Sequence, residues 1–296
     1  MTPQITQLQH RSHNMKIRIG YELEFHCPKP TPMILTLNVH STRIADLITP
    51  DRVVTDPPIP VEAFFDHHGN QRARIIAPGG KLRITNDTCL HDSGLPDTVN
   101  PQARQTAVEQ LPNEALQFLS GSRYCETDLL SGIAWQLFDN DPSITGWSRV
   151  QAICDYVYQH IEFGYGHARV TRTAWEVWQE RQGVCRDFAH LAIAFCRCMN
   201  IPARYCTGYL GDMGIPPPHG EMDFAAWFEA YLDGRWYIFD PRNNMPRIGR
   251  ILVARGRDAT DVAISTAFGA NTLTAFKIRT DEILETEYSP MLRSAL

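Results

Sequence analysis

The sequence predicts an α+β protein in which an antiparallel β domain at residues 15–105 precedes a mixed domain at residues 106–296. Before residue 105, apolar and polar residues alternate, which is the period of a strand. After it, apolar residues recur at three- and four-residue spacing, which is the period of a helix. Between the two patterns lies "LPDTVNPQARQTAVEQLPNEAL", whose Pro, Asn and Gln content is typical of a linker. The chain's 296 residues are enough for two domains.

The first domain is predicted from its strands and turns. In "MKIRIGYELEF", the residues Ile17, Ile19, Tyr21 and Leu23 fall on one face of an extended chain. Further strand-like runs follow a Pro-rich turn or flank "PGG": "MILTLNV", "RARIIA" and "KLRITN". Short strands joined in this way favour an antiparallel β-sandwich. Residues 1–14 are polar and are expected to form a flexible N-terminal extension.

The second domain is expected to contain four helices and four strands. The helical patterns are "TDLLSGIAWQLF", "GWSRVQAICDYVYQHI", "TRTAWEVWQERQGV" and a run from Cys185 to about Met199. In the last of these, Leu191, Ala194 and Phe195 belong to the stripe that should be buried. The strand patterns are "RYCTGYL", "AAWFEAYL", "RWYIFD" and, near the C-terminus, "NTLTAFKIRT".

Composition and charge exclude several classes of function. A net charge of −5 argues against binding to nucleic acid or to a membrane surface, since both favour a basic face. The first residues lack the apolar core of a secretory signal, so the eight cysteines are expected to be free thiols in the cytoplasm. No Cys/His cluster has zinc spacing, and no phosphate- or dinucleotide-binding glycine motif occurs. We therefore expect neither a metal nor a cofactor.

Cys185 is the first candidate for chemistry, because it follows Gly183 and Val184 at the start of a predicted helix. A helix N-terminus presents unpaired N–H groups and a partial positive charge. Both favour the thiolate, which is the reactive form of cysteine, and the N–H groups could bind an oxyanion. The competing interpretation is that Cys185 only fills space in the core, as most buried cysteines do.

A predicted hairpin would supply the partners of such a thiol. Asp233-Gly234 is typical of a two-residue type I′ turn, which aligns Leu232 with Arg235. Continued outward, this register sets Asp240 opposite Trp227 and diagonal to position 225. Diagonal neighbours lie about 7–8 Å apart, close enough for a carboxylate to orient an imidazole. The residue at this position is Ala225.

Three runs of this sequence resemble the bacterial transglutaminase-like superfamily: "TAWEVWQER", "GVCRDFAHLAIAFCRCMNIPARYCTGYL" and "AAWFEAYLDGRWYIFDPR". The resemblance covers about residues 173–242 most closely and implies a papain-like core at about 146–256. It implies a Cys-His-Asp triad in which Cys185 is the nucleophile and Asp240 is the orienting carboxylate. The family's histidine directly precedes Ala-Trp, and that position is Ala225 here.

The alanine has three possible explanations: an engineered inactive variant, a natural pseudoenzyme, or a substitute histidine. We favour the first, because Gly183, Cys185 and Asp240 are all kept. Of the substitutes, His190 is turned roughly 140° around the helix from Cys185 and should point away. His219, in the loop "GIPPPHGEMD", is the other candidate and could also contact substrate.

The predicted reaction is attack of the Cys185 thiolate on a peptide, isopeptide or glutamine-type amide to form a thioester. The resemblance makes hydrolysis the first choice and protein cross-linking by transfer to an amine the second. The expected partner is a peptide or another amide-containing substrate, and Trp227 could line its cleft or belong to the core. The rival hypothesis, favoured by Ala225, is a non-catalytic peptide-binding or scaffold protein.

Overall fold

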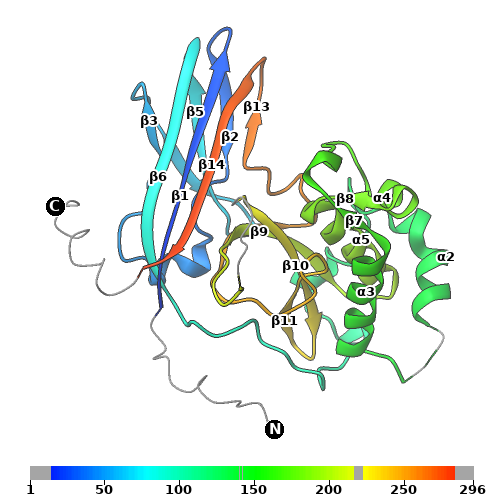
Figure 1. Ribbon diagram of the computed structural model, residues 1–296. Coiled ribbons are helices and arrows are strands. Elements are labelled where there is room, and N and C mark those ends of the chain that lie inside the picture. Colours follow the sequence, from blue (N-terminus) through cyan, green and yellow to red (C-terminus); the bar gives the residue numbers. More distant parts are fainter. Residues whose placement is uncertain (1–14, 140, 142, 217–222, 284–296) are drawn as a thin grey trace.

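The computed structural model describes residues 15–139, 141, 143–216 and 223–283, so the predicted extension at residues 1–14 lies outside the described residues. Long strands form one side of the molecule, helices form the other, and a smaller group of strands lies between them (Figure 1). Every sheet of three or more strands is antiparallel among the described residues. The predicted combination of helices with antiparallel sheets is confirmed.

The first sheet has the order β14-β1-β6-β3. Its strands are β1 (Met15–Cys27), β3 (Val54–Asp56), β6 (Gly80–Asp92) and β14 (Thr272–Glu282). The alternation read in the sequence is present, since Ile17, Ile19, Tyr21 and Leu23 are all buried. Because their side chains point to one face of β1, they join the hydrophobic core.

The second sheet has the order β13-β2-β5-β4. Its strands are β2 (Thr31–Leu35), β4 (Glu62–Phe65), β5 (Gln71–Ala77) and β13 (Ser265–Ala267). Met33 and Leu35 of β2 and Ile75 of β5 belong to the same hydrophobic core as the buried face of β1. A 3-10 helix, η1 (Ser41–Asp46), follows β2.

The C-terminal strands return to these N-terminal sheets. Strand β14 pairs along nearly its whole length with β1, from Ile17↔Glu282 to His26↔Thr272, and β13 pairs with β2. The strand predicted from "NTLTAFKIRT" therefore exists, but it extends the sheet of residues 15–92 and not a sheet of the second domain. These pairings connect the C-terminal part of the chain to the N-terminal sheets, although the paired strands are far apart in the sequence.

A third sheet, with the order β11-β10-β9-β12, lies next to the helices (Figure 1). Its strands are β9 (Ala203–Leu210), β10 (Ala225–Leu232), β11 (Arg235–Phe239) and β12 (Arg250–Gly256). A two-stranded parallel pair joins β7 (Glu162–Phe163) to β8 (Gln182–Gly183). This pair brings the chain before α4 alongside the residues that lead into α5 (Cys185–Cys198).

The helices follow the predicted order. They are α1 (Asn113–Leu116), α2 (Thr127–Phe138), α3 (Trp147–His160), α4 (Ala174–Glu180) and α5, with 3-10 turns η2 (Val108–Gln110) and η3 (Tyr165–His167). Helix α5 is central, because it packs against α2, α3, α4, β9 and β10. All of its residues from Asp187 to Cys198 are buried. We predicted that only one stripe of this helix would be buried. The buried surface is wider than that stripe, because neighbouring elements pack around the whole helix.

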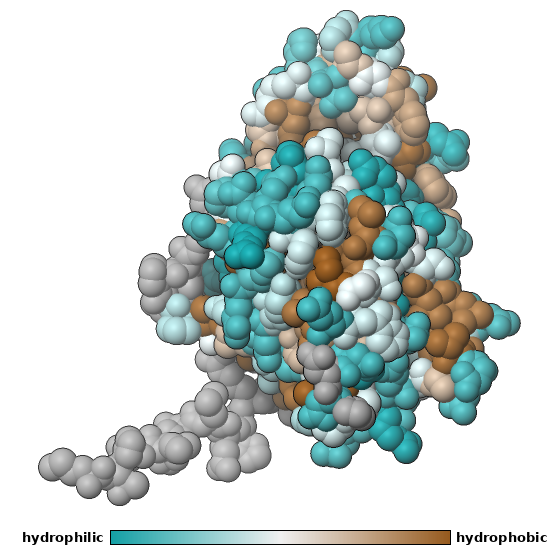
Figure 2. Space-filling view, turned by 90° about the vertical axis from the view of Figure 1, so that its right-hand side faces the viewer, coloured by the Kyte–Doolittle hydropathy of each residue, from teal (hydrophilic) through white to brown (hydrophobic). Residues whose placement is uncertain are grey.

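The surface on the helical side is mostly polar, with separate hydrophobic patches between the polar areas (Figure 2). Among the described residues, no helix is both long enough and apolar enough to cross a bilayer. All eight cysteines are free thiols, as predicted, and seven of them are buried.

Candidate active site

The start of α5 is held by a buried carboxylate. Asp187 is 0% exposed, and its Oδ2 accepts hydrogen bonds from the backbone N–H of Val184 at 3.0 Å and from Arg172 Nη1 at 3.3 Å. Gly183 is needed for this turn, because a Cβ added to it would lie 2.7 Å from the Asp187 Cβ. The Asp187 carboxylate also complements the positive end of the helix. These contacts fix Cys185 at the first position of α5.

Cys185 lines a cavity of about 170 Å³ together with Ala225 and Ala226 at the start of β10. Aromatic side chains contribute a second part of the wall, from Phe163 and Tyr165. The remaining lining comes from the end of β9, the segment before β10 and the segment after β11, as Leu210, Asp212, Asp223, Phe224, Arg242, Asn243 and Arg247. The structure thus brings Cys185 and position 225 to one cavity, although they are 40 residues apart in the sequence.

The thiol of Cys185 is not activated in this chain. Burial raises its pKa to about 11, and the negative charges of Asp223 and Asp240 act in the same direction. Hydrogen bonds from the backbones of Ala226 and Arg186 lower it, but they are outweighed. We expected the helix N-terminus to favour the thiolate. Its effect is outweighed, so the net shift of the Cys185 pKa is upward and the expectation is wrong. The reason is that desolvation disfavours the charged form and that, in the described part of the chain, no cation offsets this effect at the sulfur.

The hairpin has the predicted register. Asp233 and Gly234 both have positive φ, 47° and 83°, as a type I′ turn requires. Strand β10 pairs with β11 from Leu232↔Arg235 to Phe228↔Phe239. One further step in this alignment sets Trp227 opposite Asp240. On its other edge β10 pairs with β9, with Ala225 opposite Gly208.

Asp240 lies behind the cavity and is itself buried. Its Oδ1 accepts from the backbone N–H groups of Arg242 and Asn243, at 3.1 and 3.0 Å. Its Oδ2 accepts from Asn243 Nδ2 at 2.8 Å and from Arg250 Nη2 at 3.0 Å. The Asn243 side chain lines the cavity, whereas Asp240 does not. Asp240 is thus separated from the cavity by the Asn243 side chain. Its negative charge nevertheless contributes to the raised pKa of Cys185.

Trp227 belongs to the core. It is 1% exposed and does not line the Cys185 cavity. The guanidinium of Arg250 stacks over its ring, 4.7 Å from the centroid. Of the two roles considered for Trp227, the structure therefore supports packing, because the side chain is covered by the group that holds Asp240.

His190 does not serve as a substitute base. Its ring is buried and stacked against Tyr124, with the ring centroids 5.1 Å apart. Nε2 accepts from the backbone N–H of Ala259 at 3.1 Å, and burial lowers the pKa to about 3. His190 does not line the cavity, in agreement with the rotation predicted around α5. The other candidate, His219, lies outside the described residues.

Several cavity residues had no clear signal in the sequence. Phe163 and Tyr165 come from a short strand and a 3-10 turn without a motif, and they reach the site through the β7–β8 pair. Arg242 and Asn243 directly follow the Asp-Pro motif, which was the only available hint that they frame the site. Asp223, the last residue of "GIPPPHGEMD", lines the cavity, and so does Asp212 shortly before that run.

Comparisons with known proteins agree with this architecture. The family model of the transglutaminase-like superfamily matches residues 134–241, which include Cys185, Ala225 and Asp240. A candidate cysteine protease from Cytophaga hutchinsonii, known from a crystal structure, is 30% identical, with a TM-score of 0.80 and coverage of 92% of each chain.

Two mycobacterial proteins of unassigned function are also similar. One from Mycobacterium leprae is 33% identical over 117 residues, which are 38% of this chain and 42% of that protein. One from Mycobacterium bovis is 35% identical over 117 residues, 36% of this chain and 37% of that protein. The matched region is thus about two fifths of the length of these curated relatives. From the family model and the full-length structural relative together, we conclude that the chain belongs to the transglutaminase-like superfamily.

Proposed function

We propose that this protein is a cysteine-dependent acyl-transfer enzyme that cleaves a peptide, isopeptide or glutamine-type amide, and that the present chain is its catalytically impaired His-to-Ala form. The observation that carries the proposal is the shared cavity of Cys185 and Ala225, with Asp240 one side chain behind it. In the proposed triad, Cys185 is the nucleophile, position 225 is the place of the base, and Asp240 orients that base.

The proposed reaction has two steps. The Cys185 thiolate attacks the amide carbonyl carbon, and the N–H groups at the start of α5 stabilise the oxyanion. The C–N bond then breaks, ammonia or an amine leaves with a proton from the base, and a thioester remains. Water attacks the thioester and releases a carboxylate and the thiol. An amine attacking in place of water would give cross-linking, which we hold as the second choice.

Because position 225 is alanine, we expect this chain to cleave amides slowly. Without an imidazole at position 225, that position neither accepts the thiol proton nor donates one to the leaving amine. The raised pKa of Cys185 leaves very little thiolate at neutral pH. Removing one member of such a triad lowers kcat by roughly a thousandfold or more.

A second candidate function is non-catalytic peptide binding in the same cavity. Ala225 favours it, because a scaffold needs the cleft but no base. The two functions share the fold, and we further propose that the two N-terminal sheets pack as a β-sandwich in either case.

The test is the Ala225→His protein, assayed with a panel of peptide, isopeptide and glutamine-type amides for release of ammonia or amine. Turnover that is lost again in Ala225→His/Cys185→Ala would support the enzyme. Failure of the Ala225→His protein to cleave any amide, with peptide binding retained, would favour the scaffold. Adding an amine to the assay separates hydrolysis from transfer, because only transfer yields a conjugate.

A further inference from the structure

We infer that Arg242 selects substrates that carry a free carboxylate close to the amide attacked by Cys185. The inference names a substrate class for the proposed activity and rests on it. Arg242 and Cys185 line the same cavity, so a group bound by one lies within reach of the other.

The guanidinium of Arg242 has N–H groups that are available to bind a ligand. Its guanidinium stacks on Phe163, with Cζ 4.0 Å from the ring centroid, and Nη1 donates to Asn243 Oδ1 at 3.3 Å. In the part of the chain that the structure describes, its guanidinium takes part in no ion pair with a carboxylate. Stacking on an aromatic face leaves the N–H groups at the guanidinium edge directed outward, where they can bind a planar acceptor. An ionised carboxylate matches that edge with two parallel hydrogen bonds.

The neighbouring arginines differ in this respect. Arg250 pairs with Asp97 and Asp240, each at 3.0 Å, and does not line the cavity. Arg247 lines the cavity and pairs with Asp212 at 3.4 Å, while its Nη2 also donates to the carbonyl of Gly211 at 2.9 Å. Arg250 and Arg247 therefore already have carboxylate partners within the fold, whereas Arg242 has none among the described residues.

A second donor on the same wall has no acceptor. Arg247 is 7% exposed, and its Nε makes no hydrogen bond within the described residues. A buried N–H without a partner is costly. Arg247 thus keeps one unpaired donor, and it lines the same cavity as Arg242.

Two acidic residues, Asp212 and Asp223, also line the cavity. Asp212 is neutralised by its pair with Arg247. Asp223 Oδ1 accepts from the backbone N–H of Phe224 at 2.6 Å. Burial of its carboxyl group raises its pKa, because desolvation disfavours the charged form. The cation available to a ligand is therefore Arg242.

The size of the cavity limits the distance between the carboxylate and the amide. A cavity of about 150 Å³ accepts a molecule the size of benzene. The 170 Å³ beside Cys185 thus has room for about one side chain. A substrate that fits this space has its carboxylate on Arg242 and its carbonyl on Cys185 only a few bonds apart, as in a glutamine residue that keeps its free α-carboxylate.

Binding tests this directly and needs no turnover. In the Cys185→Ala protein, N-acetyl-L-glutamine and its neutral N-methylamide are titrated while NMR shifts are recorded. We expect the acid to bind about tenfold more tightly or better, as a charge-assisted pair implies. Arg242→Gln should abolish the preference and Arg242→Lys should keep part of it. Equal affinities for the two probes, or an undiminished preference in Arg242→Gln, would overturn the inference.

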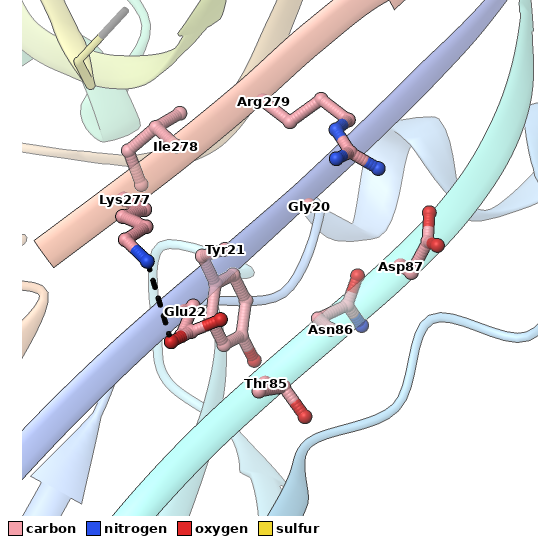
Figure 3. A pocket seen from close by; sticks show the side chains of 9 residues that line it. All are labelled: Gly20, Tyr21, Glu22, Thr85, Asn86, Asp87, Lys277, Ile278 and Arg279. Carbon is pink, nitrogen blue, oxygen red and sulfur yellow. Dashed lines mark ion pairs between the residues drawn. The ribbon is translucent and has the colours of Figure 1, made fainter.

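The matched control is Arg279→Gln. Arg279 lines a different hollow, of about 350 Å³, on the first sheet over Gly20 (Figure 3). There Arg279 lies 3.7 Å from Asp281 and Lys277 lies 3.7 Å from Glu22, so the cations already have carboxylate partners. This variant removes the same charge from the protein and should leave the preference for the acid unchanged.

A kinetic experiment distinguishes failure of the Arg242 inference from failure of the proposed function. In the Ala225→His background, Arg242→Gln should lower the acid-to-neutral ratio of kcat/KM by about tenfold or more through KM for the acid. If the Ala225→His protein cleaves neither probe nor any other amide, the proposed function fails and the binding arm still decides the role of Arg242. If it cleaves both probes equally well, the enzyme stands and the selection by Arg242 is wrong.

Discussion

Arg250 joins Asp240 to Asp97 through a single guanidinium group, with Nη2 3.0 Å from the Oδ2 atom of each carboxylate. All three side chains are buried or nearly so, and the Arg250 side chain is 3% exposed. A buried cation held by two carboxylates fixes both of them in space. Asp97 belongs to the predicted linker, so this contact also ties that segment to the candidate active site.

The first prediction concerns the stability that depends on this contact. Arg250→Met leaves two carboxylates buried without their cation, which should reduce the free energy of unfolding by about 3–5 kcal/mol. Urea unfolding followed by fluorescence measures it. Arg279→Met, at an exposed position, should change the same quantity by less than about 0.5 kcal/mol. Two variants of equal stability would contradict the role given to Arg250.

A second prediction concerns the entry into α5. Gly183→Ala forces a Cβ to 2.7 Å from the Asp187 Cβ, and overpacking of this kind costs about 1–3 kcal/mol. Gly132→Ala is the control, because it lies in α2 and an added Cβ there meets nothing within 4 Å. That change should stabilise the protein by about 0.5–1 kcal/mol. Thermal unfolding compares the pair, and a Gly183→Ala protein as stable as Gly132→Ala would remove the steric argument.

A third prediction follows from His190. Its pKa is lowered to about 3 in the folded protein, against an ordinary value near 6.5, so the unfolded chain binds more protons below pH 6.5. Protonation therefore favours unfolding, and stability falls as the pH drops below 6.5, by up to about 1.4 kcal/mol per pH unit. Asp258, Arg186 and Arg197 are the charges that act on this ring.

His190→Gln removes the titrating group and keeps a polar side chain. The difference in unfolding free energy between the parent and this variant should therefore change with pH between 6.5 and 4. A difference that stays constant over this range would show that His190 is not held neutral by the fold.

A fourth prediction concerns the thiol in the present chain. With a pKa of about 11, the thiolate fraction of Cys185 rises tenfold per pH unit below that value. Alkylation of Cys185 by iodoacetamide, located by peptide mass, should follow this slope from pH 7 to 10 without a plateau. A plateau near pH 8 would mean that an unrecognised group lowers the pKa of the thiol.

The parts of the site that could be predicted are those set by local sequence. Asp233 and Gly234 determine the turn, and the turn determines which residues of β10 and β11 face each other. Gly183 and the apolar run after Cys185 likewise locate the start of α5. Because these relations span a few residues, a single sequence contains them.

The parts that could not be predicted depend on contacts between distant segments. The pairing of β14 with β1 joins residues about 250 positions apart. The sequence of neither strand predicts which other strand it pairs with. The contact of Arg250 with Asp97 joins residues 153 positions apart. The sign of the pKa shift at Cys185 has the same origin, because the helix N-terminus is visible in the sequence and the burial that outweighs it is not.

Paired alkylation rates decide whether position 225 is the place of the base for Cys185. Iodoacetamide is reacted with the present chain and with the Ala225→His protein at pH 6, 7 and 8, and modification of Cys185 is followed by peptide mass. We expect the histidine to speed the reaction at pH 7 by about tenfold or more, because an imidazole beside the sulfur stabilises the thiolate. Equal rates in the two proteins would contradict it.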